Sequence, residues 1–248
     1  MKKTLLALAV AAALVPSLAM AEAGEIVVRL RATHIAPDES SKLGAQTDAA
    51  YPTGTLDTLT SGTSVVTSSA LYGSTSAALQ VDSNTIPEID FSYYITKNIA
   101  AELILALGTR HDVSINGTGG AVAHKLGSVN LLPPTLTLQW HFNPDQTFDP
   151  YVGAGLSYVR AMDNGLTADA TGAGLGTHPI KIDRNTWGPT LQFGLDYNLE
   201  NKWLVNFDVK KIWTGTDVQL NLAGGGWKKI DDLDIDPWVV SVGFGKKF

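Results

Sequence analysis

The chain has 248 residues, a formal net charge of −6 and a mean hydropathy of +0.06, and it contains no cysteine. Disulfides, thiol chemistry and cysteine-based metal sites are therefore excluded, and the scattered Lys and Arg residues argue against binding to nucleic acid. The length suits a single β-domain.

Residues 1–21 have the pattern of a secretory signal peptide. Lys2 and Lys3 give a positive start, residues 5–15 form an unbroken apolar run, and Ala19-Met20-Ala21 offers a cleavage site before Glu22. A membrane-spanning helix needs about 20 apolar residues, and no later run reaches half that length. The sequence therefore excludes a helical inner-membrane protein. It leaves an exported soluble protein or an outer-membrane β-barrel, formed by residues 22–248.

Eight later segments alternate apolar and polar side chains with a period of two, which is typical of strands with one apolar face. In chain order they are residues 26–33, 88–95, 99–107, 135–142, 151–162, 187–197, 203–210 and 238–248. Aromatic residues lie at the ends of the apolar faces, where barrels place their interfacial girdles. The pattern predicts an all-β fold, an eight-stranded antiparallel transmembrane β-barrel.

The connections between these segments alternate between short and long. Residues 96–98, 143–150 and 199–202 are short, whereas residues 37–84, 110–124, 163–183 and 214–236 are long and rich in Gly, Ser, Thr and Asp. Short periplasmic turns and long outer loops are typical of outer-membrane barrels. The first long segment also holds apolar residues, so we expect it to be partly ordered and folded over the barrel mouth.

Several ordered motifs resemble the outer membrane protein W family. They are residues 24–29, 99–103, 132–136, 150–155, 203–206 and 236–239. The resemblance implies an eight-stranded barrel in the outer membrane of a Gram-negative cell. It also implies a narrow apolar lumen that closes toward the periplasm, and passive, porin-like uptake of small apolar solutes that leave sideways into the membrane. The chain ends on Phe248, which resembles the signal that such barrels present to the barrel-assembly machinery.

The polar faces of the predicted strands carry charges of both signs, which should point into the lumen. These residues are Arg29, Arg31, Glu88, Asp90, Glu102, Asp196, Asp208 and Lys210. An eight-stranded barrel has room inside for little more than side chains. Because an unpaired buried charge costs several kcal/mol, these groups are predicted to pair and form a plug. Ile104 would then present an apolar surface above it, and Lys210 would make the lumen more polar or simply fill it.

A sideways exit requires a place where the wall is not paired. The third segment ends near Gly108, where related sequences often carry proline, and the fourth is preceded by Pro133 and Pro134. Proline has no N–H to donate and glycine weakens a strand. We therefore expect an opening between these two strands, which a Gly108→Val, Pro133→Thr double change should close. The apolar outer face would contact outer-membrane lipids and lipopolysaccharide.

Two alternatives stay open beside a non-enzymatic channel. Some eight-stranded barrels modify lipids, and Ser128, His124 and Asp112 are candidates for such an enzyme by position alone. A structural or receptor barrel would have the same sequence pattern. The five histidines show no spacing typical of a zinc site, so neither a metal nor a cofactor is expected.

Overall fold

The computed structural model describes residues 23–52, 67–72, 74–106, 108–116, 124–169, 176–222 and 226–248. The predicted signal peptide lies outside the described residues, as do parts of the long connections. No helix in the described ranges has the length and apolar character needed to cross a membrane.

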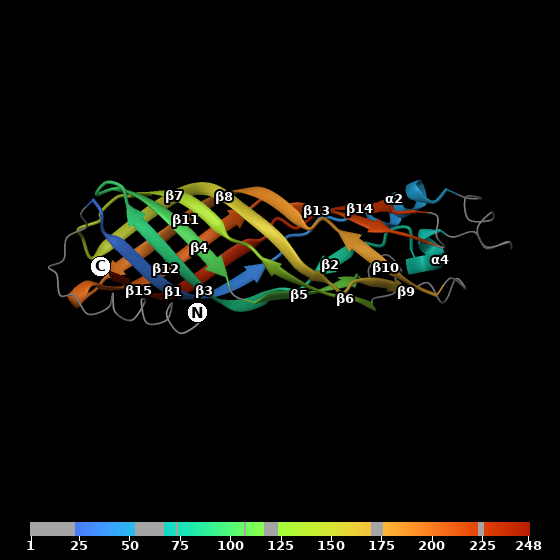
Figure 1. Cartoon of the computed structure of the whole chain (residues 1–248), viewed down its shortest axis with the longest axis horizontal. Coiled ribbons are helices and arrows are strands. Elements are labelled where there is room, and N and C mark those ends of the chain that lie inside the picture. The colour runs from blue at the N-terminus through green and yellow to red at the C-terminus, as the bar shows by residue number, and fades with distance from the viewer. Residues whose placement is uncertain are drawn as a thin grey trace, which may run out of the picture.

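Eight antiparallel strands close into a barrel in the order in which the chain visits them (Figure 1). They are β1 (Ile26–Ala36), β3 (Asn84–Tyr94), β4 (Ile99–Ala106), β7 (Thr135–His141), β8 (Phe148–Asn164), β11 (Asn185–Asn198), β12 (Trp203–Ile212) and β15 (Trp238–Lys247). Each strand pairs with the next, and β15 pairs with β1. The predicted all-β fold with eight strands is confirmed.

Side chains alternate between the lumen and the outer face, as strand geometry requires. On β12, Leu204, Asn206 and Asp208 are fully buried, whereas the neighbouring Trp203 and Phe207 are exposed. On β15, Phe244 is 63% exposed at the outer face. Such a continuous apolar outer surface suits lipid rather than water as the solvent.

The short connections all lie at one end of the barrel, near the C-terminus (Figure 1). A single 3-10 turn, Glu200–Lys202, joins β11 to β12, and the β3–β4 and β7–β8 turns lie beside it. At this end Phe248 exchanges backbone hydrogen bonds with Ile26, at 2.8 and 3.4 Å.

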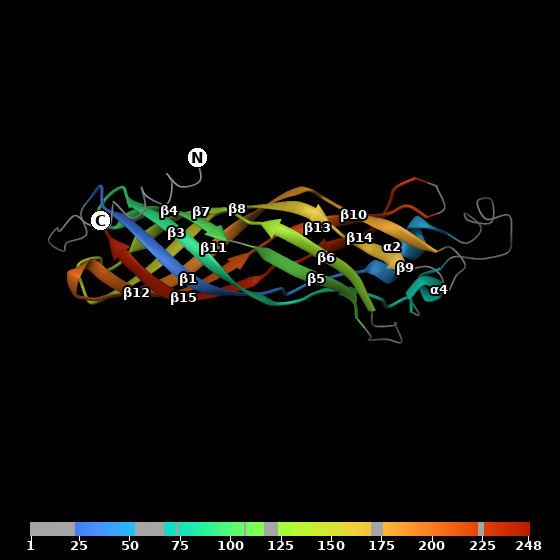
Figure 2. The ribbon, with the colours of Figure 1, turned by 60° about the horizontal axis from the view of Figure 1, so that its bottom comes forward.

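At the other end, strands carry the tube well beyond the barrel (Figure 2). They are β2 (Leu79–Val81), β5 (Thr109–Ile115), β6 (His124–Leu132), β9 (Thr167–Asp169), β10 (Thr177–Ile182), β13 (Gly215–Leu220) and β14 (Lys228–Asp234). The reading of residues 110–124, 163–183 and 214–236 as plain loops was therefore wrong for most of their described parts. Their small polar residues concealed short alternating stretches, in which Val113, Ile115, Val218 and Leu220 point inward and are buried.

The first long segment contains two short helices, α2 (Leu43–Ala50) and α4 (Ser68–Tyr72), at the far end of the tube (Figure 1). Leu43, Tyr51 and Tyr72 join an apolar cluster with side chains of the extension strands. The described part of this segment is thus ordered and covers the mouth, as expected.

Candidate functional site

A group of charged side chains crosses the lumen at mid-height, and we call it the charged floor. Its members are Arg29, Arg31, Glu88, Asp90, Glu102, Asp196, Asp208 and Lys210, each at most 4% exposed. The Arg29 guanidinium bonds Asp196 at 2.6 Å and Glu102 at 3.2 Å. β1 is paired with β3 and β15. Arg29 nevertheless reaches carboxylates of β4 and β11, because its side chain points into the lumen.

Arg31 and Lys210 complete the charged floor on its upper side. Arg31 is paired with Asp90 at 2.9 Å, with Glu102 at 2.9 Å and with Glu88 at 3.3 Å. Lys210 donates to Asp208 at 2.8 Å and to Glu88 at 3.3 Å. Three cationic groups thus face five carboxylates, which gives the floor a formal net charge of −2.

Neutral polar groups satisfy much of the remaining bonding capacity of these carboxylates. Gln139 and Gln192 donate to the second oxygen of Glu102 at 2.7 and 2.8 Å. The Tyr151 hydroxyl donates to Asp208 at 2.7 Å. Tyr151 occupies this position because its neighbour across the strand pair is Gly194, where a Cβ would lie 2.2 Å from the tyrosine ring.

On the lower side of the floor, His141 and Asp149 approach the floor residue Asp196 closely enough for the three to hold a metal ion. The histidine Nδ1 lies 2.7 Å from Asp149, and Asp196 is already paired with Arg29. The positive charge of Arg29 opposes a second cation at this position. Asp196 lies far from His141 and Asp149 in the sequence, so the spacing of residues along the chain does not group the three.

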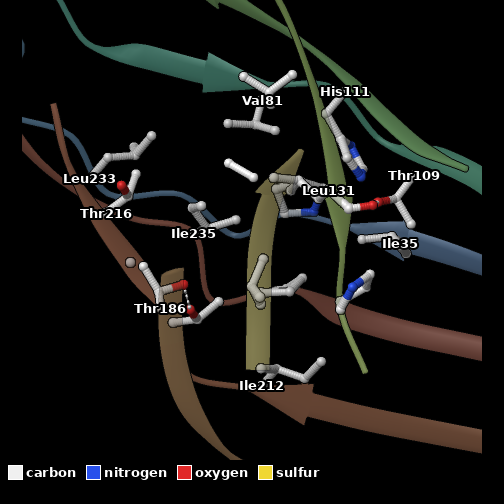
Figure 3. A pocket seen from close by; sticks show the side chains of 18 of the residues that line it. Ile35, Val81, Thr109, His111, Leu131, Thr186, Ile212, Thr216, Leu233 and Ile235 are labelled. Atoms are coloured by element: carbon white, nitrogen blue, oxygen red, sulfur yellow. Dashed lines mark hydrogen bonds between the residues drawn. The ribbon is translucent and has the colours of Figure 1, made fainter. Parts of the chain in front are cut away.

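Above the floor lies an apolar cavity of about 120 Å³, which we call the chamber (Figure 3). Its lower wall includes Ile104, Ala106 and Val239, and its upper wall includes Leu126 and Leu233, so it continues from the barrel into the extension. Several threonines also line it, and their hydroxyls bond within the protein: Thr33 donates to Ser241, and Thr186 and Thr214 bond each other. They can therefore turn methyl groups toward the chamber.

One side of the chamber coincides with an interruption of the strand ladder, and we call this interruption the break. The pairing of β4 with β7 ends at Ile104 and Thr135, and the pairing of β5 with β6 begins at Thr109 and Leu131. Between these pairs, the described residues of the two walls form no cross-strand pairs with each other. In Figure 2, β5 and β6 continue the course of β4 and β7 after this interruption.

Gly108 lies in the break with a φ of +73°, the left-handed region that favours glycine. It therefore changes the course of the strand rather than merely weakening it. A valine here would be strained even though its Cβ would meet nothing within 4 Å. The expectation that Gly108→Val would restore pairing without harm was therefore wrong.

The predicted path residues separate into two groups. Ile104, Pro133 and Lys210 line the chamber, whereas Gly108 and Pro134 flank the break without lining it. Lys210 also belongs to the charged floor.

Phe248 lies at the opposite end of the barrel, and its role in assembly stays a prediction. Sequence reasoning missed His111, a buried chamber residue on β5, because a single histidine in a predicted loop carries no pattern.

Helix α2 packs on the apolar cluster of the extension, and Asp231 of β14 bonds the residues that directly precede the helix. The Asp231 carboxylate accepts hydrogen bonds from the Ser41 hydroxyl and, at 2.8 Å, from the backbone N–H of Lys42. Burial raises the pKa of Asp231 above its ordinary value, and burial also raises the pKa of Tyr72 in the same cover to about 12. The Tyr51 hydroxyl adds a bond to the Leu220 carbonyl at 2.7 Å.

A closed barrel with a lipid-facing apolar surface, short turns at one end and a long extension at the other defines an outer-membrane β-barrel. The chain belongs to the OmpW family, whose sequence model matches residues 53–248. Outer membrane protein W of Escherichia coli strain K12 is 33% identical over 248 residues, which cover 100% of this chain and 99% of that protein. The protein is therefore located in the outer membrane.

Further similarities agree with this assignment. Outer membrane protein AlkL of Ectopseudomonas oleovorans is 30% identical over 171 residues, 67% of each chain. The dibenzothiophene metabolism operon protein PahQ of Pseudomonas aeruginosa is 26% identical over 167 residues, 67% of this chain and 72% of that one. The crystal structure of outer membrane protein OprG from Pseudomonas aeruginosa superposes with a TM-score of 0.70 and 26% identity, covering 92% of this chain and 97% of that chain.

Proposed function

We propose that this protein is a passive uptake route for small hydrophobic molecules, which leave the chamber sideways through the break and enter the membrane. The observation that carries the proposal is that the chamber and the break lie at the same height. Thr109, Leu131, Pro133 and Thr135 all line the chamber, and they also border the break. The name of the relative PahQ, which refers to the metabolism of an apolar aromatic compound, fits this class of solute.

The charged floor supports a sideways rather than an axial route. An apolar solute that moved down the axis would have to separate buried ion pairs, and each pair so broken costs about 3–5 kcal/mol. Leaving through the break requires no ion pair to separate. Pro133 and Pro134 lack the N–H groups that would otherwise bond across it. The floor therefore acts as a plug, and the break offers the path of lower free energy.

A lipid-modifying enzyme is less well supported by the geometry. The Ser128 hydroxyl accepts a hydrogen bond from Arg110 at 2.7 Å, and Asp112 is paired with Lys125. A nucleophilic serine needs a base within hydrogen-bond reach. Among the described side chains Ser128 has no such base, and the side chain of His124 lies outside them. We therefore propose a transport role without catalysis.

The first experiment measures octane uptake by cells that lack their own OmpW-family protein and express this chain. We expect faster uptake than in cells with an empty vector, at equal growth and with folded protein in the outer membrane. Equal rates in the two strains would overturn the proposed function.

The second experiment tests the exit with the Pro133→Thr, Pro134→Thr double variant. It returns two backbone N–H groups and two β-favouring side chains to the wall, while Gly108 is left unchanged. The matched control is Pro189→Thr, the same change within the fully paired β8–β11 ladder. We expect slower octane uptake in the double variant and normal uptake in the control. Unchanged uptake in the double variant, at equal amounts of folded barrel, would place the exit elsewhere.

A further inference from the structure

The chamber carries a polar group whose purpose the fold does not explain. His111 is 3% exposed and lines the chamber on β5, next to Thr109 (Figure 3). Its Nδ1 lies 2.9 Å from the backbone carbonyl of Asp82. A carbonyl oxygen can only accept, so Nδ1 carries the proton and donates this bond.

The tautomer fixed by Asp82 leaves Nε2 of the neutral ring as a hydrogen-bond acceptor. No other described residue supplies a donor to this nitrogen. Because His111 lines the chamber, a ligand or water that enters the chamber can satisfy this acceptor. His111 lines the chamber two residues along β5 from Thr109, at the edge of the break, where most of the surrounding side chains are apolar.

A second observation concerns the lower wall of the chamber. Glu88 and Lys210 line it, and they belong to the charged floor, which has a formal net charge of −2. The Lys210 ammonium already bonds two carboxylates. An anionic solute would thus meet a floor with excess negative charge, through a low-dielectric space that strengthens the repulsion. A neutral hydroxyl would meet no such penalty.

We propose that the chamber selects neutral apolar molecules that carry a hydroxyl group, such as medium-chain alcohols, over the corresponding carboxylates. His111 Nε2 accepts the hydrogen bond from the solute hydroxyl, and the charged floor disfavours the carboxylate. This specificity rests on the proposed uptake function, and it names the chemical class that the chamber recognises.

The test compares octane, 1-octanol and octanoate at neutral pH in the cells described above, with the empty-vector rate subtracted. His111→Asn keeps a donor near the position of Nδ1 but removes the acceptor at Nε2, whereas His111→Gln places an amide near Nε2. One hydrogen bond corresponds to a change of about threefold to tenfold in the octanol-to-octane ratio. We expect this loss with Asn, a partial recovery with Gln, and no change with His34→Phe, which alters an exposed histidine outside the lumen.

A second variant tests the repulsion of anions by the charged floor. Glu88→Gln keeps the shape of the side chain and removes one negative charge from the floor. We expect the octanoate-to-octanol ratio to rise by about twofold or more. Wild-type uptake of octanoate as fast as that of octanol, or an unchanged octanol-to-octane ratio in His111→Asn, would overturn the inference. Octane uptake at the empty-vector rate would instead overturn the proposed function.

Discussion

Removing the cation at the centre of the lumen should destabilise the barrel more than any change at the surface. In Arg29→Met, Asp196 loses its cation and keeps Asn206 as a neutral donor at 2.6 Å. Glu102 still has Arg31 at 2.9 Å and the two glutamine amides. The main consequence is therefore one buried carboxylate without a counter-charge.

Breaking a buried pair from one side costs about 3–5 kcal/mol. We expect a smaller cost, about 1–3 kcal/mol, for Asp196→Asn, because Arg29 keeps Glu102 and the amide can still accept a hydrogen bond. In the double variant no charge is left unpaired at this position. The double change should therefore cost less than the sum of the two single changes, with a coupling free energy of about 1–3 kcal/mol.

The free energy of unfolding can be measured by urea titration of the protein in lipid vesicles, with tryptophan fluorescence and gel mobility as independent probes of folding. Lys229→Met provides the control, since Lys229 is paired with Asp217 at 2.7 Å on the exposed surface. That change should leave the free energy of unfolding close to that of the unchanged protein, because exposed ion pairs contribute little to stability. Strictly additive costs in the cycle, or an Arg29→Met protein as stable as the control, would refute the view that the floor is held by paired buried charges.

Three further predictions follow from other parts of the molecule. Deleting Phe248 should reduce insertion without affecting export, and normal amounts of heat-modifiable barrel in outer-membrane fractions would contradict this. Because paired charges cross the lumen, planar bilayers should show very small ionic conductance, and large, stable, porin-like steps would refute a plugged lumen. The chain has no cysteine, so Leu43→Cys gives a single thiol beneath the cover. Its maleimide labelling should accelerate when Asp231→Ala removes the anchor of α2, and an equal rate would mean that Asp231 does not hold the helix.

The strand pattern of the barrel was predictable because lipid and lumen impose opposite demands on successive residues. Leu30, which is 64% exposed, stands between Arg29 and Arg31, both buried. Alternation of this kind survives in a single sequence whatever the detailed contacts are. The extension was not predictable in the same way, because its strands are short and their outer faces meet water. There, Ser, Thr and Asp serve equally well in strands and in loops.

The candidate site was predictable in its residues but not in its arrangement. The inward charges were identified from parity, yet which carboxylate meets Arg29 depends on how β4 and β11 face each other across the lumen. The left-handed conformation of Gly108 also depends on the surrounding fold. His111 gave no signal, since its importance comes from the chamber wall that β5 builds and from the carbonyl of Asp82.

The aromatic residues beside the break suggest a physical reason why the barrel tolerates it. The Pro134 carbonyl accepts a bond from the backbone N–H of Tyr158 at 2.9 Å, and the Tyr158 ring lies 4.6 Å from that of Trp187. Aromatic residues in this kind of position are typical of the interface between membrane and water. Unsatisfied backbone groups cost several kcal/mol in hydrocarbon, but at the interface water and lipid head groups can bond them. Under the proposed function, a solute that left through the break would enter the outer part of the membrane at this height.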